Sequence, residues 1–150
     1  MSLQQTAFVA GAKLPDRAAL QSAVDALGFD CKIDAVYVPS QCSGFLPCVL
    51  AGRASGFEVY FESAAEVLLD FPHLAECVGN RDVAITFRWG GDMAECACVL
   101  IVSAALAKAF AAIVHYQDDD LLYSAEQLVD EARSALRAET AAVPRRSWPC

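Results

Sequence analysis

Hydrophobic residues are most concentrated between Asp92 and Val114, where almost every position is apolar. This stretch contains neither Gly nor Pro and is rich in Ala and Leu, which is typical of a helix with little surface facing water. We therefore predict a buried central helix with Asp92 as its N-cap. A membrane-spanning helix is the rival interpretation, because about 20 apolar residues can cross a bilayer. Glu95 and Lys108 limit the uncharged run to residues 96–107, so the buried helix is favoured.

Three further segments carry helix signals. In the first, apolar residues recur at helical spacing after a proline, which is well suited to the first position of a helix. The other two open with a capping-box pattern, in which a serine is followed three residues later by Glu or Gln. The predicted helices run from Pro15 to Leu27, from Ser63 to a stop near Phe71 and Pro72, and from Ser124 to about Ala138.

Alternation of apolar and polar residues predicts strands in the middle of the chain. The clearest run from Gly56 to Glu62 and from Val83 to Trp89. Because successive side chains point to opposite faces, each of these strands has one core face and one polar face. The other predicted strands are Cys31 to Val38, Cys48 to Arg53, Ala112 to Tyr116 and Leu121 to Tyr123, with a loop at 39–47 and a hairpin turn at Ala54 and Ser55.

The order of these elements indicates the fold class. Strands and helices alternate irregularly, with a run of strands in the middle, which favours an α+β fold over a regular α/β one. We predict a single domain over residues 1–140, with a mainly antiparallel sheet, helices packed on one face and the long buried helix at the centre. Residues 141–150 contain two prolines and no hydrophobic period, and we expect them to form a mobile tail.

Composition and charge narrow the function classes. The chain has 150 residues, of which 56% are hydrophobic and 20% charged, as in a folded globular domain. Its net charge of −8 disfavours nucleic acid as a partner and favours a basic surface. The first eight residues lack the basic and apolar regions of a secretory signal, so we expect a cytoplasmic protein. The odd number of cysteines, seven, fits reduced thiols.

Cysteine and histidine are the candidate catalytic types. A thiol next to a base could act as a nucleophile, which would make the chain a small cytosolic cysteine-dependent hydrolase. Structural thiols are the preferred interpretation, because none of these residues lies in a recognisable local motif. The candidate sets combine Cys42 or Cys48 with His73 or His115 and an aspartate.

No metal site or cofactor is predicted. Cys96 and Cys98 would point about 200° apart on a helix and cannot share an ion. Cys42 and Cys48 lie close in sequence, but a zinc site would need a second pair of ligands. We therefore predict no catalytic residue, metal or cofactor.

Two polar groups are candidates for binding a protein partner. The polar face of the middle strands combines carboxylates with an aromatic residue and an arginine, the residue types of specific interfaces. An acidic run between the last two strands would attract a basic surface. An ordinary polar sheet face and a solvated turn are the alternatives. The candidate partner-binding residues are Glu58, Tyr60, Glu62 and Arg88, flanked by Thr86, and Asp118, Asp119 and Asp120.

Three of these stretches also carry a resemblance. The segments Arg81 to Glu95, Asp120 to Leu128 and Gly56 to Glu62 resemble small bacterial cytosolic proteins that serve as immunity partners of polymorphic and type VI secreted toxins. The resemblance covers about Gly56 to Leu136 and leaves the first third of the chain uncovered. It implies a non-enzymatic antitoxin that binds a cognate toxin domain and blocks its active site or the approach of its substrate. It supplies no catalytic residue.

Overall fold

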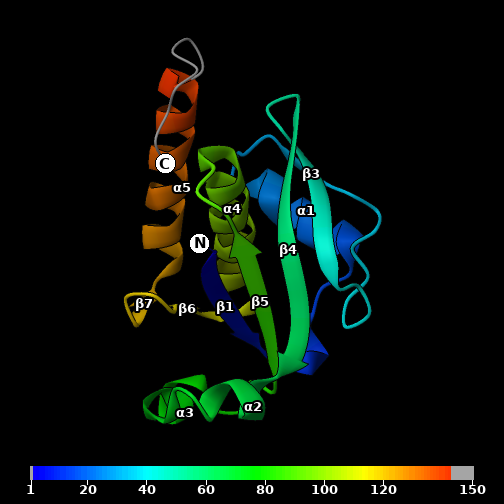
Figure 1. Ribbon diagram of the computed structural model, residues 1–150. Helices are drawn as coiled ribbons and strands as arrows, with labels where there is room; N and C mark the ends of the chain where they lie inside the picture. The colour runs from blue at the N-terminus through cyan, green and yellow to red at the C-terminus, as the bar shows by residue number, and fades with distance from the viewer. Residues whose placement is uncertain (1, 143–150) are drawn as a thin grey trace.

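An antiparallel sheet forms the frame of the molecule (Figure 1). The computed structural model describes residues 2–142. The strands are β1 (Leu3–Val9), β2 (Cys31–Ile33), β3 (Gly44–Leu50), β4 (Arg53–Ser63), β5 (Val83–Trp89), β6 (Ile113–Tyr116) and β7 (Leu121–Tyr123). They form one seven-stranded sheet in the order β2-β3-β4-β5-β1-β6-β7. The first strand of the chain therefore lies inside the sheet, between β5 and β6.

Three helices cover one face of this sheet: α1 (Arg17–Ala26), α4 (Met93–Phe110) and α5 (Ala125–Ala142). α4 lies against the sheet, with α1 and α5 on either side of it (Figure 1). Within residues 2–142, α4 is the one helix with the length and apolar composition of a membrane span. Its residues 97–106 are buried in the main core. The predicted buried central helix and the α+β fold class are therefore confirmed.

Short helices cover one end of the opposite face. They are α2 (Ala64–Leu68), the 3-10 helix η2 (Pro72–Leu74) and α3 (Ala75–Val78); a further 3-10 turn, η1, spans Gly11–Lys13. Val67, Leu74 and Val78 form a second apolar cluster with Phe8 of β1 and Ala84 of β5. The prediction placed helices on one face only, whereas these three short helices partly cover the other.

β1 was not predicted from the sequence. Gln5 and Thr6 interrupt the hydrophobic pattern of this segment. Both are buried in the sheet. The side-chain amide of Gln5 donates a hydrogen bond of 2.8 Å to the hydroxyl of Ser103 on α4, which satisfies the amide inside the core.

The boundaries of β2 and β3, and the position of the turn after β3, also differ from the prediction. β2 ends at Ile33 and not at Val38, and β3 begins at Gly44 inside the expected loop. The turn between β3 and β4 falls at Ala51 and Gly52, and not at the predicted Ala54 and Ser55. The φ angles of 50° at Ala51 and 81° at Gly52 fit the primed turns that connect tight hairpins. Alanine rarely adopts positive φ, so the sequence did not indicate a turn at this position.

The two capping-box predictions have different outcomes. Ser124 and Gln127 exchange backbone-to-side-chain hydrogen bonds of 3.1 and 2.8 Å, as the motif requires. Ser63 precedes α2 but its side chain makes no capping bond. α5 continues to Ala142, beyond the predicted end at Ala138, and the remainder of the expected tail, residues 143–150, lies outside the described residues.

Gly56 allows a close approach between β3 and β4. A Cβ atom at this position would lie 2.4 Å from the ring of Phe45 and 2.6 Å from the carbonyl oxygen of Leu46, at a φ of +154°. We expect Gly56→Ala to lower the free energy of unfolding by about 1 to 3 kcal/mol. Chemical denaturation followed by circular dichroism measures this change.

Gly90→Ala is the matched control for this substitution. A Cβ atom on Gly90 would meet only the Glu95 carboxylate, at 3.8 Å. The control should change the stability by no more than about 0.5 kcal/mol. Equal stabilities for the two variants would contradict the close packing of Phe45 on Gly56.

Candidate interaction surface

One part of the sheet is left without a covering helix. It lies on the face opposite α4 and beyond the end that α2 and α3 cover, and we call it the open face (Figure 1). Strand register aligns its side chains in two rows across the sheet. One row runs from Tyr60 through Thr86 to Thr6 and His115, of which Thr86, Thr6 and His115 are buried. The other row contains Glu58, Arg88 and Gln4, with Glu62 at the next position of β4.

Hydrogen bonds organise the polar residues of the open face. The Tyr60 hydroxyl donates to Glu58, and this carboxylate raises the pKa of the phenol. The Thr86 hydroxyl donates to Glu62 at 2.9 Å. With the Gln4 amide oriented to satisfy its neighbours, the Arg88 guanidinium donates to the Gln4 oxygen at 3.1 and 3.2 Å. The side chains are therefore held in place before any partner binds.

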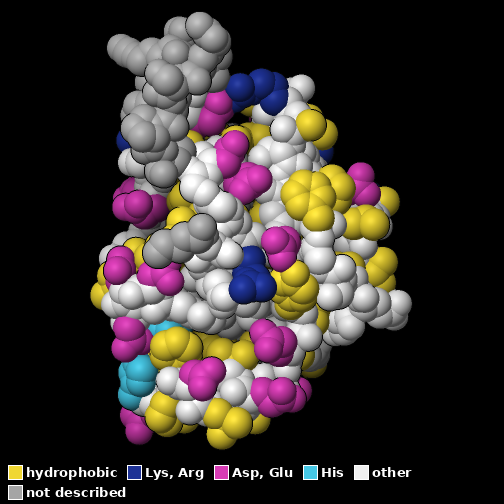
Figure 2. All heavy atoms as spheres, viewed as in Figure 1, with side chains coloured by type: hydrophobic (Ala, Val, Ile, Leu, Met, Phe, Trp, Pro, Cys, Tyr) yellow, Lys and Arg dark blue, Asp and Glu magenta, His cyan; other side chains and the backbone are white. Residues whose placement is uncertain are grey.

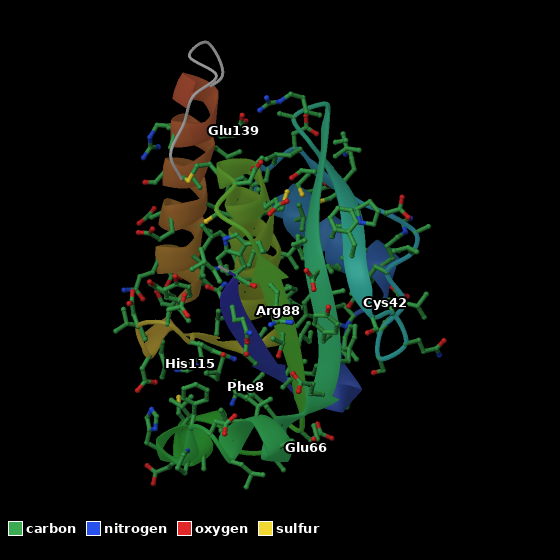
Figure 3. All side chains as sticks on the ribbon, in the orientation of Figure 1. Phe8, Cys42, Glu66, Arg88, His115 and Glu139 are labelled. Carbon is green, nitrogen blue, oxygen red and sulfur yellow. The ribbon has the colours of Figure 1, made fainter. Side chains whose placement is uncertain are left out.

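A hollow of about 470 Å³ opens onto this face. The chain segment from Ser40 to Ser43 forms one wall, and residues of β1, β4 and β5 form the floor. Figure 3 shows Arg88 over the centre of the sheet and Cys42 on the loop side. Of the predicted partner-binding residues, Tyr60, Glu62 and Arg88 line the hollow, as does the flanking Thr86.

An apolar groove of about 290 Å³ adjoins the hollow and shares the wall at residues 41–43. Val36, Val38 and Phe45 line it, and 58% of the Phe45 surface is exposed. Packing on Gly56 holds the Phe45 ring in this exposed position. Sequence reasoning missed these apolar residues because it treated the segment as an ordinary loop and strand.

The predicted acidic residues are not all available to a partner. Asp120 lies in the turn between β6 and β7, and its Oδ1 is 2.7 Å from Nε2 of His115 and 3.0 Å from Nε2 of His73. Asp118 accepts a hydrogen bond of 3.3 Å from Tyr116. The acidic turn is therefore separate from the hollow. The contact between Asp120 and His73 connects this turn to η2.

The histidine at the centre of this link is fully buried. His115 has 0% exposure, and the Phe71 ring packs edge-on against it with centroids 4.6 Å apart. Both histidines of the chain contact the same carboxylate oxygen. Hydrogen bonds from these imidazoles lower the pKa of Asp120 below its usual 3.8.

Replacing this carboxylate should give a pH-dependent loss of stability. Because the pKa of Asp120 is lowered on folding, its stabilising contribution is present above the unfolded pKa and is lost as the pH falls through the folded pKa. We expect Asp120→Asn to be less stable than the parent at pH 7, with a smaller difference at pH 2. Asparagine also tolerates the positive φ of 52° at this position.

Urea denaturation at both pH values measures this difference. Asp119→Asn, in the same turn, is the matched control and should show a smaller change. A difference for Asp120→Asn that is constant from pH 7 to pH 2 would contradict the role of the carboxylate.

The structure does not assemble the catalytic sets considered for a hydrolase. Cys48 is buried on the helix-covered face, whereas His115 lies on the other face of the sheet. Cys42 borders the hollow, but the two histidines are both engaged with Asp120. A different cysteine group does come together, namely Cys31, Cys48 and Cys98. No local motif signals it, because its members are far apart in the sequence.

Comparisons of the chain with protein-family models, with curated proteins and with solved structures found no significant match.

Proposed function

We propose that this chain is an immunity protein, which binds a cognate secreted toxin domain and neutralises it by covering its active site. The open face, with its hollow and the adjoining apolar groove, is the observation that carries this proposal. Protein interfaces combine a buried apolar and aromatic centre with a polar rim. Phe45 and the neighbouring valines fit the first requirement, and the polar rows of the open face fit the second.

Electrostatics gives a second line of support. The chain carries a net charge of −8, and Figure 2 shows acidic side chains spread widely over the viewed face, with few Lys or Arg side chains among them. Hydrophobic side chains gather on the side of β3 in the same view. An acidic inhibitor would steer a basic toxin domain toward itself and associate faster at low salt.

The organisation of the polar residues supports binding with little rearrangement. In the free chain Glu62 accepts a hydrogen bond from Thr86, and Arg88 donates hydrogen bonds to Gln4. Side chains that are held before binding lose less conformational entropy when the complex forms. The proposed partner is therefore a folded protein domain with a basic surface, bound as a one-to-one complex.

Co-expression with the products of neighbouring genes tests the proposal. We expect the chain to co-purify with one toxic domain at nanomolar affinity, and to suppress the activity of that domain. The association rate should fall as the salt concentration rises. Hydrogen exchange of the free and bound chain should show protection over β4, β5 and residues 36–45.

Two outcomes would overturn the proposal. In the first, the chain purifies alone although the neighbouring products are folded and present. In the second, a complex forms but its protection maps to α1 and α5 and leaves the open face unchanged.

A chain that hydrolyses ester or amide probes through Cys42 would instead support the hydrolase alternative, and Cys42→Ser would then abolish the activity.

A further inference from the structure

Three cysteines from different parts of the chain meet on the helix-covered side of the sheet. Cys31 lies on β2, Cys48 on β3 and Cys98 on α4. Their sulfur atoms all lie within 4.8 Å of one another. The three residues are between 0 and 2% exposed. The group is thus a closed cluster of thiols at a junction of three elements.

The spacing of the sulfur atoms is close to that of a metal site. A Zn–S bond is about 2.3 Å long, so three sulfur atoms around one ion lie about 4 Å apart. The cluster meets this spacing with a contraction of less than about 1 Å. Thiolates are soft ligands and select soft or borderline ions, whereas Mg²⁺ and Ca²⁺ prefer oxygen.

Burial of the cluster favours a divalent ion over a monovalent one. Three thiolates held within 4.8 Å of one another in the core would place three negative charges together. A divalent cation compensates more of this charge than a monovalent one does.

Ser55 of β4 lies next to the cluster, within hydrogen-bonding reach of Cys98. Ser55 also lines a pocket of about 210 Å³, together with Asp92 and Glu139. Arg53 also lines this pocket and forms an ion pair with Glu139. An oxygen atom on the Ser55 side would complete a four-coordinate site.

We propose that Cys31, Cys48 and Cys98 form a binding site for Zn²⁺. The ion forms three Zn–S bonds, and the protons of the three thiols are released to solvent. Because the site joins β2, β3 and α4, bound zinc would stabilise the folded state. The site lies on the sheet face opposite the open face, so it is independent of the proposed immunity function.

Metal titration of the full chain tests the site directly. The protein is reduced, freed of metal with a chelator, and titrated with Zn²⁺ against a chromophoric competitor under anaerobic conditions. We expect one equivalent to bind at submicromolar affinity. Co²⁺ should bind at the same site and give thiolate-to-cobalt charge-transfer absorption, with visible bands typical of four-coordinate cobalt. Proton release should accompany binding and decrease as the pH rises.

Cysteine variants assign the ligands. Cys31→Ser, Cys48→Ser and Cys98→Ser should each weaken zinc binding by at least about tenfold. Cys77→Ser is the matched control, because Cys77 is exposed and lies outside the cluster. The Cys77→Ser variant should bind zinc with the same affinity as the parent. Circular dichroism of the metal-free variants establishes that they are folded.

Alkylation of the parent protein keeps the proposal testable if a variant does not fold. In partial denaturant, Zn²⁺ should protect the three cluster cysteines from maleimide, as mapped by mass spectrometry, while Cys77 remains reactive. Absence of stoichiometric zinc binding, or zinc binding without this selective protection, would overturn the proposal. Binding of Cu(I) without any binding of Zn²⁺ would overturn the assignment of a divalent ion.

Discussion

Ile101→Ala is expected to lower the free energy of unfolding by about 2 to 5 kcal/mol. Ile101 lies in the middle of α4, is fully buried and belongs to the main core between the sheet and the helices. Truncation removes apolar contacts and leaves a cavity that the close-packed surroundings fill only in part. Urea denaturation followed by circular dichroism and tryptophan fluorescence measures the loss.

Leu69→Ala is the control for this prediction. Leu69 follows α2 and is 81% exposed, so its truncation should change the stability by less than about 0.5 kcal/mol. A cost for Ile101→Ala as small as that of the control would mean that α4 is not packed in the core in solution. The membrane-spanning interpretation of this helix would then regain support.

The elements that were predicted well carry their signals locally. β5 alternates apolar and polar residues from Ile85 to Trp89, and the structure has the same bounds as the prediction, Val83–Trp89. α4 begins after the predicted N-cap, where the Asp92 carboxylate accepts hydrogen bonds from the backbone N–H groups of Ala94 and Glu95 at 2.7 and 3.2 Å. Periodicity and capping act within a few residues, so they can be seen without the fold.

The elements that were missed depend on contacts between distant residues. Gln5 looks unsuitable for a buried strand until Ser103 is placed opposite its amide, 98 positions further along the chain. Pro47 suggested a loop, but it lies in β3 opposite Gly56, and its carbonyl accepts a hydrogen bond from Asp34 at 3.2 Å. Tertiary contacts override local preference in both strands.

The candidate surface was predictable only in part, for the same reason. The period of two in β4 and β5 placed Glu58, Tyr60 and Arg88 on one face, and the structure agrees. Whether that face is open depends on where the helices pack, which the strand pattern does not contain. Asp120 was grouped with the partner-binding residues, whereas its carboxylate is held by two histidines from separate segments.

Phe45→Ala is expected to weaken binding of the proposed toxin partner by about 30-fold or more, equivalent to about 2 kcal/mol. Phe45 is the large aromatic residue at the edge of the open face, with 58% of its surface exposed in the free chain. Exposed aromatic side chains that become buried at the centre of an interface often contribute most of the binding energy. Calorimetry or surface-based kinetics with the co-purified domain measures the loss, which should appear mainly in the dissociation rate.

Leu121→Ala is the matched control, because Leu121 is also an exposed apolar residue, with 47% exposure, but projects from β7 on the opposite sheet face. It should bind within about threefold of the parent. Gly56→Ala supplies an independent check, since it displaces the Phe45 ring without removing it and should also weaken binding. If Phe45→Ala and Gly56→Ala both bind like the parent, the open face is not the interface, even if the chain does have a toxin partner.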